Sequence, residues 1–205
     1  MTEAYTDRNA GTGNKTLVPA VTIKNSSNAD VTANYNITLV NFTAGTINPK
    51  ALTVSGITAA STIYDGTTTA KLGGTAAFLA AEVPGTGTTS DGAPYTVDSV
   101  SPGTVTGTLA ASNVGTQNVT TSVAVTGSGN GNYTVPPQAG LTQQIMQKAL
   151  TITANAQSKS YGATVAFGSG STAFTSTGLQ NSQTIGTVTL ACSGGAATAA
   201  VSGSP

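Results

Sequence analysis

The chain repeats part of its own sequence at a spacing of about 100 residues, and this repeat limits the fold more than any other feature. Three segments return in the same order, the first after 104 residues and the other two after 98 residues. A weaker echo of Tyr64-Asp65-Gly66 follows in Ser160-Tyr161-Gly162. A unit of this length is a domain rather than one coil of a solenoid. The matched segments are Asn9-Ala10-Gly11-Thr12 with Asn113-Val114-Gly115-Thr116, Asn34-Tyr35 with Asn132-Tyr133, and Lys50-Ala51-Leu52-Thr53-Val54 with Lys148-Ala149-Leu150-Thr151-Ile152.

The repeat divides the chain into three parts. We expect the C-terminal part of one module at residues 1–50, a complete module at 51–148, and the N-terminal part of another at 149–205. No Pro-rich or Ser-rich linker separates them, which favours a stiff rod over flexibly joined beads.

The two offsets differ by six residues, which places an insertion in a surface loop at Asn25–Asp30, opposite Gly127–Gly131. The first fifteen residues contain no apolar segment of a signal peptide, and residues 201–205 look like a break in mid-sequence. We therefore expect a fragment of a longer polypeptide.

Thr alternates with aliphatic residues along much of the chain, as in Leu52-Thr53-Val54, Leu150-Thr151-Ile152-Thr153 and Thr187-Val188-Thr189-Leu190. Thr is β-branched and favours an extended backbone, and alternation with a period of two is typical of half-buried strands. No apolar period of 3.6 residues is sustained, and no run of 18 apolar residues predicts a membrane span. The pattern predicts an all-β fold of tandem β-sandwich modules in an elongated array, with a β-grasp-like module as the alternative.

Within the complete module, the apolar segments and turn formers predict a series of short strands. In the third part, Gly178–Gln183 is a candidate for a short turn of helix. The expected strands lie near 51–57, 69–73, 77–82, 95–99, 103–109, 117–126, 132–135 and 141–146, with turns at Asp65-Gly66, Asp91-Gly92, Pro102-Gly103 and Gly127–Gly131.

Charge is scarce, since only 7% of residues are charged and the formal net charge is zero. Seven dispersed Lys and Arg residues cannot form the basic surface of a nucleic-acid-binding protein. The absence of His excludes a His-based catalyst or metal site, and a single Cys excludes an internal disulfide framework. Polar surface comes instead from 39 Thr, 19 Ser and many Asn.

The acidic residues form no tight pair in sequence, although Asp91 and Asp98 are candidates to meet across a hairpin. The loop Gly127–Gly131 lacks the Lys and helix of a phosphate-binding loop, so a hairpin turn is the better interpretation. Cys192 lacks the partners of a catalytic thiol. We expect no catalytic residue, no metal and no cofactor. The seven acids are Glu3, Asp7, Asp30, Asp65, Glu82, Asp91 and Asp98.

The motifs together resemble a known family. Leu52–Ala59 leads into Ser61-Thr62-Ile63-Tyr64-Asp65-Gly66-Thr67-Thr68, and Asn113-Val114-Gly115-Thr116 and Gly131-Asn132-Tyr133-Thr134 follow. This ordered set resembles the YDG-type repeat domain of large bacterial exoproteins, including filamentous-haemagglutinin-like adhesins. The third part, with Ser160-Tyr161-Gly162 and Phe174–Leu179, looks like the related YGX-type domain of the MBG family. The resemblance implies a repeated, non-catalytic module.

The motif residues have simple structural interpretations. Tyr64 is expected to pack under the turn that Gly66 completes, Asn132 to adopt left-handed geometry, and Tyr133 to anchor the next strand. A glycan-stacking role for the Tyr residues is the functional alternative. The family-motif residues singled out in this way are Tyr64, Asp65, Gly66, Asn113, Gly115, Asn132, Tyr133, Tyr161 and Gly162.

The expected function is therefore a stalk repeat of a secreted or surface-displayed bacterial protein, located outside the cell or on its surface. Its partners would be neighbouring repeats of the same polypeptide, with a host glycan or protein as a further partner, and neither nucleic acid nor membrane insertion. Two alternatives stay open: a glycan- or mucin-binding module, and an accessory β-domain of a carbohydrate-active exoprotein. Six Asn-x-Ser/Thr sequons are candidate glycosylation sites, although a Thr-rich chain produces sequons by chance: Asn14, Asn25, Asn36, Asn41, Asn118 and Asn132.

Overall fold

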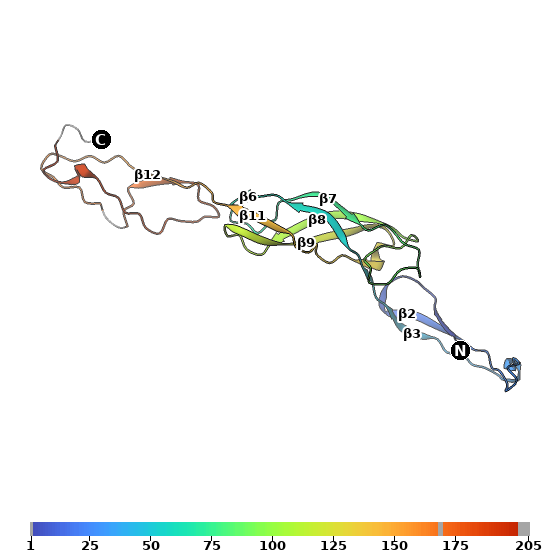
Figure 1. Cartoon of the computed structure of the whole chain (residues 1–205). Helices are drawn as coiled ribbons and strands as arrows, with labels where there is room; N and C mark the ends of the chain where they lie inside the picture. Colours follow the sequence, from blue (N-terminus) through green and yellow to red (C-terminus); the bar gives the residue numbers. More distant parts are fainter. Residues whose placement is uncertain (1, 168–169, 201–205) are drawn as a thin grey trace. The chain divides into compact units, whose positions relative to one another are not determined.

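The computed structural model describes residues 2–167 and 170–200, and these residues confirm the all-β prediction. They form thirteen strands, β1 to β13, together with three short 3-10 turns, and contain no α-helix (Figure 1). Accordingly, no helix within these residues is long and apolar enough to cross a membrane. Residues 201–205, where the sequence indicates a break, lie outside the described ranges.

The N-terminal part forms a three-stranded antiparallel sheet in the order β1-β2-β3. Its strands are β1 (Thr2–Tyr5), β2 (Gly11–Ala20) and β3 (Phe42–Ile47). A loop with a 3-10 turn, η1 (Thr32–Asn34), joins β2 to β3. The proposed insertion at Asn25–Asp30 is an exposed turn closed by a bridge between Lys24 and Asp30, as expected for a surface loop.

The following residues form two further sheets and a short strand pair. A four-stranded sheet has the order β6-β11-β9-β8, and β5 pairs with β7 in an antiparallel hairpin. The short strand β4 pairs in parallel with β10. The strands are β4 (Lys50–Ala51), β5 (Val54–Ala59), β6 (Thr62–Ile63), β7 (Leu72–Phe78), β8 (Ser99–Leu109), β9 (Gly115–Ser128), β10 (Tyr133–Thr134) and β11 (Thr142–Met146), with the 3-10 turn η2 (Asn130–Asn132) before β10.

The core lies between the β5-β7 hairpin and the sheet that contains β8 and β9. Val54 and Ile57 of β5 contact Val123 of β9, and partly buried apolar residues of β7 and β8 pack around them. Burial alternates along β9, where Val119, Thr121 and Val123 are buried and their neighbours are exposed. This is the period of two that the sequence predicts.

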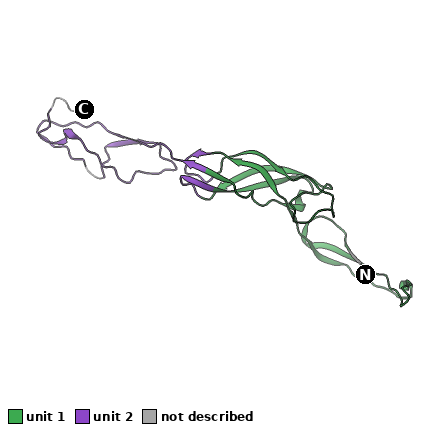
Figure 2. Ribbon diagram, in the orientation of Figure 1, with its two compact units in different colours: residues 1–60, 69–110, 118–143 green, residues 61–68, 111–117, 144–205 purple. Residues whose placement is uncertain are grey.

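The third part contributes β12 (Thr151–Ala154), which pairs with β13 (Phe174–Thr177), and a 3-10 turn, η3 (Ser193–Gly195). By internal contacts the chain forms two compact units (Figure 2). Unit 1 comprises residues 1–60, 69–110 and 118–143, and unit 2 comprises residues 61–68, 111–117 and 144–205.

Several expected strands are wrong in their bounds. The strand expected at 51–57 divides into β4 and β5, because Leu52 and Thr53 leave the ladder. The strands expected at 69–73 and 77–82 are one strand, β7, and those at 95–99 and 103–109 are one strand, β8. Pro102-Gly103 is therefore not a turn. A register shift in the pairing of β8 with β9 between Pro102 and Val105 absorbs the Pro instead, as a bulge allows.

The turn assignments are only partly right. Asp65-Gly66 and Asp91-Gly92 lie in turns or bends where both Gly residues have positive φ. Gly127 instead belongs to β9, and the chain reverses at Gly129, whose φ is 79°. The short helix considered at Gly178–Gln183 is absent from this described stretch, because Asn181 and Ser182 adopt left-handed backbone angles that a right-handed helix excludes. Thr187–Leu190 likewise forms no strand beyond one bridge residue.

Candidate functional site

Lys50, the first residue of the matched segment Lys50–Val54, starts the short strand β4. Its backbone pairs with Tyr133 of β10, and its side chain is only 6% exposed. The Nζ atom donates to Glu82 Oε1 at 2.5 Å and lies 2.8 Å from Asp91 Oδ1. The same ammonium lies 4.1 Å from the centre of the Tyr95 ring. We call Lys50, Glu82, Asp91 and Tyr95 the Lys50 cluster.

The electrostatics of the Lys50 cluster favour a permanent ion pair. Burial works to lower the pKa of Lys50, but hydrogen bonds to Asp91 and Glu82 outweigh burial and raise that pKa above its ordinary value. The hydrogen bond from Lys50, followed by those from the backbone N–H groups of Ala93 and Thr88, lowers the pKa of Asp91 to about 2. The Lys50 ammonium is held by two carboxylates and an aromatic face. It therefore serves a structural role and does not give up its proton at neutral pH.

A second network connects the two repeat copies at Asp98. The Asp98 carboxylate is 4% exposed and accepts from Arg8 Nη2 at 3.1 Å and from the Tyr133 hydroxyl at 2.9 Å. Asn132 Nδ2 also donates to Asp98, at 3.3 Å, and Asn132 Oδ1 accepts from the Ala10 N–H at 2.8 Å. We call Asp98, Arg8, Asn132 and Tyr133 the Asp98 network. It satisfies a buried carboxylate with three donors, as buried charge requires.

The roles expected for Asn132 and Tyr133 are thereby revised. Tyr133 anchors its strand, as predicted: its side chain is buried, and its hydroxyl accepts from the Tyr95 N–H at 3.0 Å. Burial raises the pKa of the Tyr133 hydroxyl first, and the hydrogen bond to Asp98 raises it further. Asn132 does not adopt left-handed geometry. It ends the η2 turn, and its side chain rather than its backbone carries its role.

The Lys50 cluster and the Asp98 network border one cavity of about 700 Å³ in unit 1. Polar and aromatic side chains line this cavity. The aromatic side chains are partly covered, because Tyr133 is only 6% exposed and the Lys50 ammonium lies over one face of the Tyr95 ring. The lining residues are Arg8, Ala10, Ile47, Asn48, Pro49, Lys50, Pro84, Thr89, Tyr95, Val97, Asp98, Asn132 and Tyr133.

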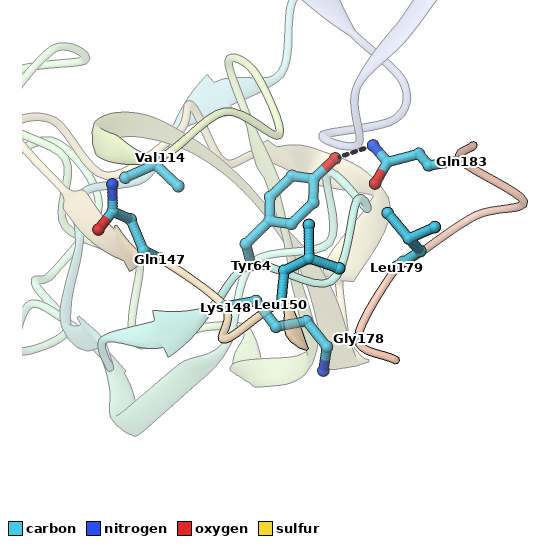
Figure 3. A pocket seen from close by; sticks show the side chains of 8 residues that line it. All are labelled: Tyr64, Val114, Gln147, Lys148, Leu150, Gly178, Leu179 and Gln183. Atoms are coloured by element: carbon cyan, nitrogen blue, oxygen red, sulfur yellow. Dashed lines mark hydrogen bonds between the residues drawn. The ribbon is translucent and has the colours of Figure 1, made fainter. Parts of the chain in front are cut away.

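The Tyr-Asp-Gly motif lies in unit 2, where it contacts the third part of the chain. The Tyr64 hydroxyl accepts from Gln183 Nε2 at 2.6 Å, and the ring borders a cavity of about 300 Å³ (Figure 3). Asn181 Nδ2 donates to the Gly66 carbonyl at 2.8 Å, and its side chain occupies the place of a Cβ at Gly66. We call the residues lining this cavity the Tyr64 pocket: Tyr64, Val114, Gln147, Lys148, Leu150, Gly178, Leu179 and Gln183.

Two of the sequence motifs meet at the Tyr64 pocket. Val114, between Asn113 and Gly115, lines the pocket with Tyr64, and Gly115 starts β9 with a φ of 124°. Asp65 accepts from the backbone N–H and the hydroxyl of Thr67, and these bonds lower its pKa. The positive φ of Gly66 fits the expected turn, and this turn also bonds to Asn181 and Gln183.

The remaining motif residues lie apart from both sites. Tyr161 is 74% exposed, and Gly162 has a φ of 83° with open space where a Cβ would lie. Cys192 is exposed and free. Asp91 and Asp98, considered as a pair, belong instead to the Lys50 cluster and the Asp98 network.

Sequence reasoning missed the Lys50 cluster. Lys50 served only to mark the repeat, and Glu82 and Asp91 lie 32 and 41 residues away in the chain, too far to be associated by spacing. One signal was present in the sequence. A single Lys precedes an apolar segment in both copies, at Lys50 and Lys148, but only Lys50 is followed by acidic residues, because residues 149–205 contain no Asp or Glu. Accordingly, Lys148 is exposed whereas Lys50 is buried.

Among the described residues, no three His, Cys, Asp or Glu side chains gather closely enough to hold a metal ion. No curated protein and no solved structure matches the chain. Residues 48–140 match the family model of the YDG domain, a range that begins just before Lys50 and includes the Tyr64, Asn113 and Asn132-Tyr133 motifs. The YDG-type resemblance of the sequence is therefore shown for residues 48–140.

Proposed function

We propose that this chain is a non-catalytic stalk segment of a secreted or surface-displayed bacterial adhesin-like protein, in which successive repeats support one another. The observation that carries this proposal is the Asp98 network, in which Arg8 and the Ala10 N–H of the first copy bond to Asp98 and Asn132 of the next copy.

The two ends of the YDG domain support the same proposal, each within its own unit. In unit 1, Arg8 and Ala10 of the first copy bind Asp98 and Asn132. In unit 2, Gln183 and Asn181 of the third part bind Tyr64 and Gly66. Direct contacts of this kind restrict motion between neighbouring modules more than a flexible linker does.

The low charge is compatible with such a role. Thr, Ser and Asn keep the surface hydrated, and only 7% of residues are charged, so salt has few exposed charges to screen. The adhesin-like context, the location outside the cell and the YGX-type assignment of residues 149–205 belong to this proposal and rest on the sequence resemblance.

Small-angle X-ray scattering of the full chain tests the stalk function. We expect a maximum dimension that places the repeats end to end, unchanged between low and high salt. Pulsed electron paramagnetic resonance with spin labels at Ser27 and Ser112 should give one narrow distance distribution. A compact particle, or a broad distribution in wild-type protein, would contradict the proposal.

One observation favours a second candidate function, a glycan- or mucin-binding module. The 700 Å³ cavity is lined by Arg8, Asn48 and Tyr95, groups that suit sugar hydroxyls and rings. A mucin and glycan array tests this candidate, with Tyr95→Ala as the variant and Tyr161→Ala as the control, since Tyr161 is exposed and lies outside the cavity. Retention that Tyr95→Ala alone abolishes would support it, and absence of retention by wild type would refute it.

A further inference from the structure

The N-terminal sheet has the same strand order as part of the four-stranded sheet. The order β1-β2-β3 corresponds to β8-β9-β11, because the offset of 104 residues places β1 on β8 and β2 on β9, and the offset of 98 places β3 near β11. The 3-10 turns correspond as well. Both η1 and η2 end at an extended Tyr, Tyr35 or Tyr133, whose N–H bonds to the first residue of the turn.

The two sheets differ in what covers them. Tyr5, Leu17 and Phe42 form one row across β1, β2 and β3, because Leu17 pairs with both Tyr5 and Phe42. Gly45 supports this for Leu17 and Tyr5, since a Cβ there would lie 2.5 Å from Leu17 and 2.9 Å from Tyr5. We call Tyr5, Leu17 and Phe42 the Tyr5 face. Tyr5 is 44% exposed and Phe42 is 60% exposed.

The equivalent face in the second copy is covered. Leu109 and Thr121, which correspond to Tyr5 and Leu17, are 4% and 3% exposed. The β5-β7 hairpin lies over this face: Val54 and Ile57 contact Val123, and Leu72 lies 3.0 Å from the Cβ position of Gly107. Hence a face that the second copy buries under a hairpin stays open in the first.

Tyr35 shows the same difference. Its counterpart Tyr133 is 6% exposed because it pairs with Lys50 and bonds to Asp98 and to the Tyr95 N–H, whereas Tyr35 is 58% exposed. The strand partner and the two hydrogen-bond partners of Tyr133 thus come from residues 50–98. Val40, five residues after Tyr35 in the chain, is also 77% exposed.

We propose that the Tyr5 face and Tyr35 are a docking surface for one kind of partner, the first half of another YDG repeat, equivalent to residues 50–104 of this chain. Its hairpin would cover Tyr5 and Phe42, and its counterparts of Asp98 and Tyr95 would receive the Tyr35 hydroxyl. This inference rests on the proposed stalk function, because it names the partner that would cover the exposed face of the first repeat copy.

The test uses the full chain with a second copy of residues 50–104 placed ahead of Met1. Met1 corresponds to Val105 at the offset of 104, so this fusion keeps the repeat in register. Hydroxyl-radical footprinting with mass spectrometry measures the labelling of Tyr5, Tyr35 and Phe42, with Tyr133 as an internal reference. For Tyr35 we expect about a tenfold loss of labelling, which is the ratio of 58% to 6% exposure.

The matched control carries Ser in place of Val54, Ile57, Leu72 and Phe78 in the added copy only, and should restore the labelling of Tyr5 and Phe42. Amide hydrogen exchange reports whether the added hairpin folds. If the added hairpin were protected from exchange but Tyr5, Tyr35 and Phe42 were labelled as before, the inference would be overturned. An added copy that stays unprotected from exchange would also overturn it, because docking should order the hairpin. Neither result alters the scattering test of the stalk, so the two failures are distinguishable.

Discussion

Replacing Lys50 by Met tests whether the Lys50 cluster stabilises the fold of unit 1. The substitution keeps the apolar stem but removes the ammonium that bonds to Glu82 and Asp91 and lies over Tyr95. The two carboxylates would then repel each other without a cation between them. We expect destabilisation of unit 1, where all four residues lie.

The magnitude follows from burial. Removing one partner of a fully buried ion pair costs about 3–5 kcal/mol. Here the side chains of Glu82 and Asp91 are 18% and 29% exposed, so water recovers part of their solvation. The loss of two charge-assisted hydrogen bonds, discounted for this exposure, leaves about 2–3 kcal/mol. Lys148→Met is the matched control, and as an exposed substitution it should change the free energy of unfolding by less than about 0.5 kcal/mol.

Urea unfolding followed by circular dichroism measures the stability of both variants, and hydrogen exchange of β4 and β10 locates the change at this strand pair. The double variant Lys50→Met/Glu82→Gln should recover part of the loss, because one of the two unpaired charges is then gone. If Lys50→Met and Lys148→Met had equal effects, the burial of Lys50 would not be what stabilises unit 1.

Three further predictions concern pH, the Tyr64 pocket and the η2 turn. The folded-state pKa of Asp91 is lowered to about 2 from 3.8, so its contribution to the stability of unit 1 is complete above pH 3.8 and is lost as the pH falls towards 2. Acid unfolding of wild type and of Asp91→Asn should differ over this range, and parallel unfolding curves would exclude the contribution. Tyr64→Phe removes the hydrogen bond from Gln183 and should lower the stability of unit 2 by about 0.5–1.5 kcal/mol. Faster amide hydrogen exchange at residues 181–183 would show this loss, whereas unchanged exchange would show that the bond does not stabilise this turn. Gly129→Ala forces a left-handed residue against Asp98 and should cost about 1–2 kcal/mol or more. Gly131→Ala, with a free Cβ position, is its control in thermal unfolding and should be close to neutral.

Local patterns in the sequence were sufficient to predict several parts of this structure. The all-β class follows from β-branched residues at every second position, and β9 shows the expected alternation of buried and exposed residues. The turns at Gly66 and Gly92 follow from the tolerance of Gly for positive φ. The anchoring role of Tyr133 was also expected from the sequence, because an aromatic ring at the start of a strand can be buried by the segments that pack on that strand.

Strand bounds were less predictable, since pairing partners decide where a ladder continues. Pro102-Gly103 has the composition of a turn, yet β9 continues beside it and β8 accommodates it as an irregularity. Leu52 continues the alternation but leaves the ladder, although it is 2% exposed. Propensity describes one residue at a time, whereas register belongs to two strands.

The sequence by itself determined the repeat, the strand period, the scarcity of charge and the residues of the turns. Only the tertiary structure decided that Lys50 lies between Glu82 and Asp91, and that Tyr64 binds a turn more than 110 residues later. It also decided that Tyr133 is buried while its counterpart Tyr35 is exposed. The physical reason is that burial and ion pairing depend on which segments meet, and identical local sequences acquire different environments when their neighbours differ.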